Sequence, residues 1–122
     1  MILADASVWV NHFRRGGAQL SQALLDGRML IHPFVIGEIA CGSLRSRPNV
    51  LSDLQRLPSA VTAEHEEVLG FLDQNRLYGV AITWIDVHLL ASARLSHCRL
   101  WTLDKHLLTA ATRLHLGYSA RN

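Results

Sequence analysis

Short apolar runs alternate with longer amphipathic segments along the chain, and this alternation limits the possible folds most strongly. The apolar runs at residues 1–4, 29–32 and 99–103 are too short for helices and are typical of buried strands. Helices are expected at residues 7–13, 19–25, 33–44, 49–55, 62–77, 86–97 and 105–116. Strands that are apolar throughout belong to parallel sheets covered on both faces. The pattern therefore predicts an α/β fold, a three-layer α/β/α sandwich with a short central parallel sheet, and leaves the strand order open.

Several residues mark the expected ends of these segments. Gly16 should stop the first helix and Gly27 the second, because glycine readily adopts the left-handed conformation that follows a helix. Pro33 suits the first position of the third helix. Residues 57–61 could form one more short strand. Thr62 is the expected N-cap of the following helix, although the acidic third residue of a capping box is missing there.

The composition indicates one globular domain spanning residues 1–122. Apolar residues make up 49% of the chain and charged residues 18%, so a core can form. No apolar run approaches the roughly 18 residues that span a bilayer, and no basic segment precedes the first apolar run, so neither a membrane span nor a secretory signal is expected. Cys41 and Cys98 form no CxxC pair, and buried free thiols in a reducing cytoplasm are favoured over a disulfide.

The basic residues are almost all arginines. The formal net charge is +2, and Lys105 is the single lysine among twelve cations. Arginine suits bidentate contact with phosphate, but a high arginine content can equally reflect the base composition of the source genome. The basic excess alone therefore does not establish a nucleic-acid partner.

Four of the ten acidic residues stand in apolar surroundings. Asp5 follows Met-Ile-Leu-Ala, and Glu38 is the only charge in Phe-Val-Ile-Gly-Glu-Ile-Ala-Cys. Asp86 interrupts Thr-Trp-Ile-Asp-Val-His-Leu-Leu, and Asp104 follows Leu-Trp-Thr-Leu. Because an unpaired buried carboxylate is destabilising by several kcal/mol or becomes protonated, these four acids require a compensating partner.

The predicted positions of these acids bring them to one edge of the sheet. Asp5 and Asp104 end strands, whereas Glu38 and Asp86 lie in the first turns of helices that follow the sheet. Such positions lie along the carboxyl edge of an open parallel sheet, where ligands bind. Two carboxylates about 4 Å apart repel by about 4 kcal/mol at an effective dielectric near 20. A hard divalent cation relieves this repulsion, and carboxylate ligands favour magnesium or manganese over zinc.

Each acid also has a simpler interpretation. Asp5, Asp86 and Asp104 could each be an ordinary helix N-cap, worth about 1 kcal/mol. Glu38 could extend into solvent or pair with Arg45. The presence of all four together, rather than any one of them, favours a shared metal site.

Other catalytic signatures are absent. His65-Glu66 begins an HExxH pattern, but Leu69 occupies the position of the second histidine. The sequence contains neither a GxSxG nucleophile elbow nor a P-loop. The three tryptophans lie in apolar runs and are expected in the core rather than as platforms for base stacking. They are Trp9, Trp84 and Trp101.

Four motifs in order resemble those of the PIN-domain nucleases, in particular the VapC-type toxins of type II toxin–antitoxin pairs. They are Asp5-Ala-Ser7-Val-Trp-Val, Glu38-Ile-Ala-Cys-Gly-Ser, Asp86-Val-His-Leu-Leu-Ala-Ser-Ala and Leu-Trp-Thr102-Leu-Asp104. The resemblance spans nearly the whole chain. It implies a single PIN-like nuclease domain that is a Mg²⁺- or Mn²⁺-dependent endoribonuclease, is held inactive by a cognate antitoxin and is usually a homodimer.

The resemblance also implies roles for individual residues. Asp5 and Asp86 match the positions most directly bound to the metal, and Glu38 and Asp104 complete the site. The hydroxyl residues Ser7 and Thr102 match positions that support the acids. The chain departs from many relatives at His106, where they carry a further aspartate, which puts a fifth acidic ligand and a second metal in doubt. The segment after Gly117 is short, so the last edge strand is uncertain.

The mechanism expected from these residues is hydrolysis of an RNA phosphodiester by metal-activated water. Glu38 or Asp104 would position or deprotonate that water. Because a carboxylate site repels RNA unless cations surround it, Arg14 and Arg15 are candidates for RNA binding, although they could equally form a solvated helix end.

Two alternatives belong to other functional classes. The chain could act mainly as a non-catalytic co-repressor subunit that reaches DNA only through its antitoxin, and its mean hydropathy of +0.15 hints at surface for a partner helix. A phosphoryl-accepting receiver domain also gathers acids at a sheet edge. It needs an acidic pair near the start and a late lysine, whereas this chain has Ala4-Asp5 and its only lysine directly follows Asp104.

Overall fold

A three-stranded parallel sheet lies at the centre of the computed structural model, which describes residues 1–119. The strands are β1 (Ile2–Ala4), β2 (Met29–Leu30) and β3 (Arg99–Trp101), arranged in the order β2-β1-β3. Leu3 pairs with Leu30 on one side and with Leu100 on the other. All three of these leucines are buried, as the apolar runs predict for a sheet covered on both faces.

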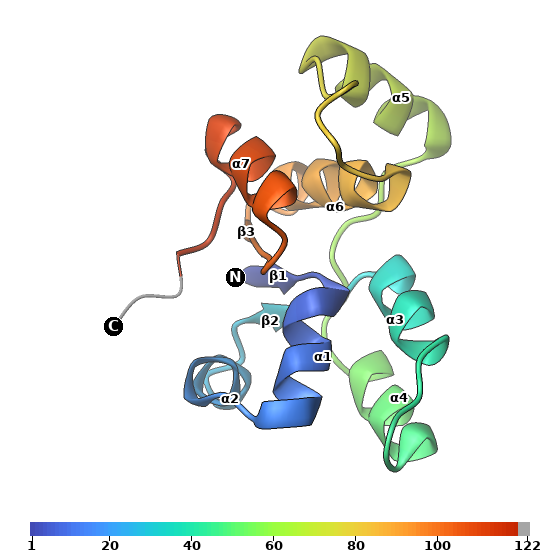
Figure 1. The fold of residues 1–122 in the computed structure, drawn as a ribbon, viewed down its shortest axis with the longest axis vertical. Helices are drawn as coiled ribbons and strands as arrows, with labels where there is room; N and C mark the ends of the chain where they lie inside the picture. Colours follow the sequence, from blue (N-terminus) through green and yellow to red (C-terminus); the bar gives the residue numbers. More distant parts are fainter. Residues whose placement is uncertain (120–122) are drawn as a thin grey trace.

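Helices cover the two faces of this sheet. They are α1 (Ala6–Arg15), α2 (Ala18–Leu25), α3 (Pro33–Ala40), α4 (Arg47–Gln55), α5 (His65–Gln74), α6 (Trp84–Leu95) and α7 (Lys105–Arg113). Figure 1 shows α1 to α4 on one side of the strands and α5 to α7 on the other. The chain moves outward from β1 to β2 and then returns to β3, on the opposite side of β1. Since crossover connections are right-handed, this reversal places the later helices on the opposite face, and the predicted three-layer sandwich is confirmed.

Both edges of the sheet continue as single parallel bridges in the described residues. Ile31 pairs with Ser59 at the β2 edge, and Leu100 pairs with Gly117 at the β3 edge. The short strand predicted at 57–61 is therefore reduced to one bridge, held by Ala60 N–H donating to the Ile31 carbonyl at 2.8 Å. The pairing of Gly117 provides the C-terminal edge that the sequence left uncertain.

Several helices begin or end away from their predicted boundaries because of specific contacts. The helix predicted from Thr62 begins at His65, since the Glu67 carboxylate accepts the backbone N–H of Glu64 at 2.9 Å and fixes the first turn there. The helix predicted to reach residue 44 ends at Ala40, whose carbonyl accepts two hydrogen bonds from the Arg47 guanidinium, at 3.2 and 2.9 Å. Sequence alone does not reveal such contacts.

The predictions about the core are correct for most residues. Trp9 and Trp101 are buried, but Trp84 is only half-buried, because it begins α6 and only part of its ring packs against the core. Both cysteines are free thiols, as predicted, and Cys98 is buried. Cys41 is exposed, because it caps the C-terminus of α3 at the start of a surface loop. No helix in residues 1–119 is both long and apolar enough to cross a membrane.

Candidate functional site

Asp5 occupies the point where the strand order reverses. It directly follows β1, and its backbone N–H donates to the carbonyl of Trp101 in β3 at 3.0 Å. It is also the N-cap of α1, because its carboxylate accepts the N–H of Val8 at 3.3 Å. Only 6% of the residue is exposed. The carboxyl ends of β1 and β3 thus form the kind of switch point at which open parallel sheets bind ligands.

Two hydroxyl groups hold the Asp5 carboxylate, one at each oxygen. Ser7 Oγ donates to Oδ1 and Thr102 Oγ1 donates to Oδ2, both at 2.5 Å. Each hydroxyl is fixed in turn by a backbone donor, Leu103 N–H to Ser7 at 3.0 Å and Asp104 N–H to Thr102 at 3.0 Å. The two hydroxyl residues selected from the sequence therefore contact Asp5 and set the orientation of its carboxylate.

The pKa of Asp5 is raised above its ordinary value. Burial is the largest cause, and the negative charge of Asp86 adds to it. The hydrogen bonds from Ser7, Thr102 and Val8 act in the opposite direction, because they favour the ionised form. Ionisation of this carboxylate is therefore less favourable than that of an aspartate in water, and a nearby positive charge would offset the difference.

Glu38 experiences the same negative field. It lies on α3, and burial of its carboxyl group, together with the charges of Asp86 and Asp5, raises its pKa. The residue as a whole is exposed, so its carboxyl group remains accessible to solvent. Asp5, Glu38 and Asp86 therefore influence one another electrostatically, although they come from three separate segments.

Asp104 is a helix N-cap, as its simpler interpretation expects, whereas Asp86 is the third residue of α6 and forms a capping box with the N-cap Thr83. The Asp86 carboxylate accepts the Thr83 N–H at 3.0 Å, and Thr83 Oγ1 accepts the Asp86 N–H at 3.1 Å. Asp104 is the N-cap of α7 and accepts the Leu107 N–H at 2.9 Å. Capping uses only one oxygen of each carboxylate, so it leaves lone pairs for a ligand. Asp104 connects to Asp5 through the shared hydroxyl of Thr102.

None of the four acids forms an ion pair in the described part of the chain. The ion pairs there join Arg28 to Asp26 at 3.6 Å and Arg56 to Asp53 at 2.8 Å, both on the surface. Glu38 is therefore not paired with Arg45. Within residues 1–119, no group of three or more His, Cys, Asp or Glu side chains lies close enough to hold an ion without moving. The carboxylate donors fit a hard divalent cation in their chemistry.

A groove of about 490 Å³ runs along the outer side of Glu38. Its wall includes Arg14 from the end of α1 and Arg45 from the loop after α3. Within the described residues neither guanidinium forms an ion pair or a hydrogen bond, so both are available to a ligand. Arg15 is exposed but does not line the groove. The sequence indicates Arg45 only as a possible partner of Glu38, seven residues before it, whereas its place on the groove wall depends on tertiary structure.

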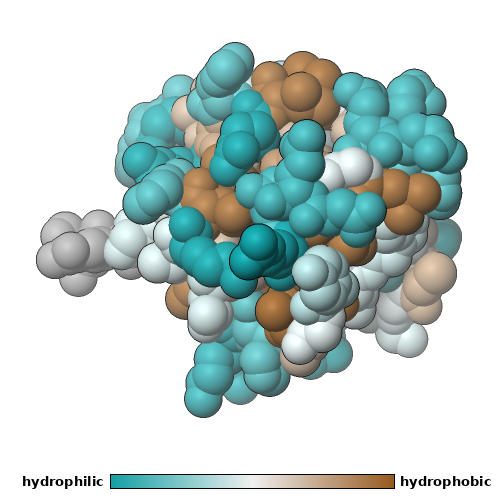
Figure 2. Space-filling view, turned by 90° about the horizontal axis from the view of Figure 1, so that it is seen from above, coloured by the Kyte–Doolittle hydropathy of each residue, from teal (hydrophilic) through white to brown (hydrophobic). Residues whose placement is uncertain are grey.

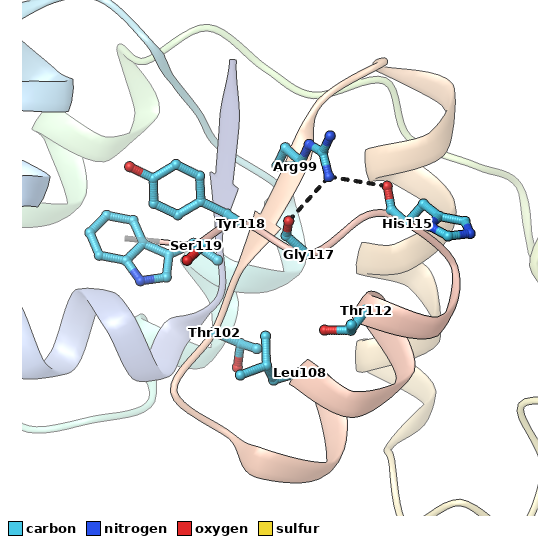
Figure 3. Close-up of a pocket in the computed structure, with 9 residues that line it drawn as sticks. Arg99, Thr102, Leu108, Thr112, His115, Gly117, Tyr118 and Ser119 are labelled. Atoms are coloured by element: carbon cyan, nitrogen blue, oxygen red, sulfur yellow. Dashed lines mark hydrogen bonds between the residues drawn. The ribbon is translucent and has the colours of Figure 1, made fainter. Parts of the chain in front are cut away.

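A second cavity, of about 530 Å³, lies beside β3 and α7 (Figure 3). Arg99 donates there to the carbonyls of His115 and Gly117, each at 3.4 Å, and the ring of Tyr118 lies 5.1 Å from that of Trp101. Thr102 lines this cavity, but none of the four acids does. The cavity and the acidic site are therefore different places that meet at one threonine.

Comparisons with known proteins agree with this geometry. The family model described as PIN domain matches residues 2–112. Ribonuclease VapC32 of Mycobacterium tuberculosis, in strains CDC 1551 and H37Rv, is 41% identical over 111 residues, which cover 90% of this chain and 90% of the relative. The crystal structure of PAE2754 from Pyrobaculum aerophilum has a TM-score of 0.61 over 90% of this chain and 78% of that chain. Its 18% identity makes it a likeness of fold alone.

The parallel sheet, its switch point and the acids around it thus coincide with a family match over almost the whole chain and with a close relative of the same length. This chain belongs to the PIN-domain family, and within it to the VapC group.

Proposed function

We propose that this chain is the toxic endoribonuclease of a toxin–antitoxin pair and that it hydrolyses RNA phosphodiester bonds with Mg²⁺ or Mn²⁺. The observation that carries the proposal is the buried carboxylate of Asp5, held by two hydroxyls at the switch point and facing the negative charges of Asp86 and Glu38. The 41% identity to a protein named ribonuclease VapC32 supports the reaction class.

The four acids would share the work of the site. Asp5 and Asp86 are the proposed direct ligands, with Glu38 and Asp104 completing the set. A divalent ion bound there would supply Lewis-acid polarisation of the phosphate and a water molecule of lowered pKa. Ser7 and Thr102 keep both Asp5 oxygens in fixed directions, so the carboxylate needs little reorganisation when a ligand arrives.

Glu38 is the stronger candidate for accepting the proton of the attacking water. A general base must reach the proton that it accepts, and Glu38 is exposed and lines the same groove as Arg14 and Arg45. The Asp104 carboxylate is engaged with the first turn of α7 instead. We therefore assign positioning to Asp104 and proton transfer to Glu38.

The groove beside Glu38 offers a path for the RNA backbone. Arg14 and Arg45 line it without partners among residues 1–119, and guanidinium groups bind phosphate in a bidentate manner. We propose that Arg14 and Arg45 neutralise the phosphates next to the scissile bond. Arg15, which lies outside the groove, would add only long-range attraction.

The decisive experiment measures cleavage of a structured RNA by the purified chain with Mg²⁺ or Mn²⁺ and again with EDTA. We expect cleavage only with the metal, and we expect Asp5→Asn to reduce it by more than about 100-fold, because a direct ligand matters more than the supporting groups of a metal site. Asp73→Asn, which neutralises an exposed carboxylate on α5, is the matched control and should cleave normally. Equal cleavage with EDTA, or an active Asp5→Asn variant, would exclude the proposal.

Partner binding is a separate part of the proposal. We propose a cognate antitoxin as the main protein partner, a homodimer of this chain, and contact with DNA only through the antitoxin. Exposed leucines on three neighbouring helices support a protein interface: Leu69 of α5, Leu95 of α6 and Leu108 of α7 are each at least 40% exposed. Figure 2 shows that apolar patches on this side are separated by polar residues, as in reversible interfaces. Sedimentation of the chain alone and with the product of the adjacent gene would test both associations.

The cellular setting follows from the thiols. Cys41 is exposed and unpaired, and Cys98 is buried and unpaired. Because an exposed free thiol persists best in a reducing compartment, we propose that the chain works in the cytoplasm.

A further inference from the structure

Five rings form a continuous cluster between the first turns of α3, α5 and α6. His88 lies at its centre, with its ring centroid 4.7 Å from that of Phe34 and 4.8 Å from that of Trp84, both edge to face. His32 extends the cluster behind Phe34, at 5.2 Å, and His65 extends it beyond Trp84, also at 5.2 Å. Figure 1 shows the first turn of α6 next to α3, which brings these distant segments together.

The outer members of this ring cluster are accessible to a ligand. Phe34 is 39% exposed, Trp84 is half-buried and His65 is exposed, whereas His32 and His88 are buried beneath them. An exposed phenylalanine supported from below by two buried imidazoles is held rigidly, so it can receive a flat partner with little loss of conformational entropy. Packing of the core does not explain why Phe34 stays in solvent.

The ring cluster adjoins the acidic site on two helices. Phe34 and Glu38 are four residues apart on α3 and therefore share one face of that helix. Asp86 lies between Trp84 and His88 in the first turn of α6. Glu38 thus has rings on one side and, on the other, the groove lined by Arg14 and Arg45.

We propose that the ring cluster is a subsite for an unpaired RNA base next to the scissile phosphate, with Phe34 and Trp84 as the stacking surfaces. This inference rests on the proposed ribonuclease function and adds a substrate requirement: the nucleotide at this position must be single-stranded. Unpaired bases stack on aromatic and imidazole rings, whereas bases within an A-form helix cannot reach a side chain in this way. The backbone would lie in the arginine groove while the base turns toward Phe34.

Binding of two short, unpaired oligoribonucleotides tests the subsite, one with bases and one abasic along the same ribose-phosphate backbone. Affinities are measured by fluorescence anisotropy on the full chain with EDTA, which separates binding from cleavage. We expect Phe34→Leu, which keeps an apolar side chain but removes the ring, to weaken binding of the base-containing probe about 5- to 150-fold. The abasic probe should bind as before, and Phe34→Tyr should bind both probes normally.

Tyr78→Leu provides the matched control, since Tyr78 is a ring that is 62% exposed and lies outside the cluster. The wild-type protein gives an independent readout, because Trp9 and Trp101 are 2% and 9% exposed and quenching by the base-containing probe reports on Trp84. The subsite is wrong if Phe34→Leu weakens binding of both probes equally or of neither. It is also wrong if the probe with bases quenches the tryptophan fluorescence no more than the abasic probe does. A Phe34→Leu variant that loses affinity only for a protein partner would also overturn it. If the subsite is wrong but the proposed function is right, the wild-type chain still cleaves RNA with Mg²⁺ or Mn²⁺. If the proposed function itself is wrong, that cleavage is absent.

Discussion

The acidic edge between β1 and β3 and the cavity beside α7 make opposite use of their polar groups. The cavity has a volume of about 530 Å³. Its guanidinium, Arg99, donates to two backbone carbonyls, and its aromatic ring, Tyr118, packs against Trp101. At the acidic edge, Asp5 is buried and its ionisation is opposed by Asp86. The guanidinium in the cavity has acceptors within the protein, whereas the carboxylates at the edge have hydrogen-bond donors but no positively charged partner among the described residues.

This difference indicates where a ligand contributes most. A ligand entering the cavity must compete with contacts that already exist, while a cation at the acidic edge relieves repulsion that is already present. The surface acids Asp26 and Asp53 differ from those at the edge, since each has an arginine within 4 Å. Uncompensated charge therefore identifies the site better than volume does.

Thr102 belongs to both regions and offers the sharpest way to separate them. Thr102→Val removes the hydroxyl that donates to Asp5 and accepts from Asp104 N–H, while the side chain keeps its shape. We expect RNA cleavage and Mn²⁺ affinity to fall about 10- to 100-fold, the usual effect of losing a group that orients a metal ligand. Cleavage rates and calorimetric titration with Mn²⁺ measure the two quantities.

Two further variants control for this change. Thr102→Ser keeps the donor and should retain most activity. Thr112→Val alters a threonine that lines only the cavity, so cleavage should be unchanged. If Thr112→Val were as damaging as Thr102→Val, the cavity rather than the hydroxyl bridge to Asp5 would be the functional region.

The stability of the ion-free protein should also depend on pH through the carboxylates of the acidic edge, and this effect should be smaller than that of Thr102→Val. Asp5 and Glu38 have pKa values raised above 3.8 and 4.5, so in the folded protein they hold protons at pH values where the unfolded chain has lost them. Their contribution to the free energy of unfolding is therefore fully present below the unfolded pKa values and is lost as the pH rises through the folded ones. The ion-free protein should melt at progressively lower temperature across that window.

Metal binding should follow the opposite direction. Because the ion binds the ionised carboxylates, Mn²⁺ affinity should rise with pH over the same window, by at most about tenfold per pH unit for each proton released. Calorimetry at a series of pH values measures this slope, and Asp5→Asn should reduce it. An affinity independent of pH from the unfolded pKa values up to neutrality would mean that these carboxylates do not hold the ion.

The sequence predicted those parts of the site that depend on local order. Asp5 and Asp104 directly follow the apolar runs at residues 1–4 and 99–103, so a parallel sheet brings them to one edge whatever the strand order. Ser7 lies two residues after Asp5, close enough to donate to it within the first turn of α1. The neighbouring helix starts could be predicted for the same reason, since capping depends on adjacent residues.

The parts that sequence missed depend on contacts between distant segments. Trp84 was expected in the core, because its neighbours are apolar, but its ring lies 5.2 Å from that of His65 in α5, a contact between segments that are far apart in the sequence. Likewise, only tertiary structure places Arg45 across a groove from Arg14. Apolar context predicts that a side chain can be buried, and the positions of other elements decide whether it is.

Arg99→Ala is the smallest and most direct test of the comparison. It removes the guanidinium from the cavity without touching an acid, and we expect the free energy of unfolding to fall by less than about 1 kcal/mol, because Arg99 is exposed and both of its hydrogen bonds are long. Urea denaturation measures that change, and RNA cleavage should equal that of the wild type. A large loss of cleavage with an unchanged unfolding curve would mean that the guanidinium acts on substrate, since a structural role cannot produce that pair of results. The hydrogen bonds to His115 and Gly117 would then orient Arg99 toward the substrate rather than stabilise the edge of the sheet. In that case, a polar group with satisfied hydrogen bonds could still belong to a functional site in this fold.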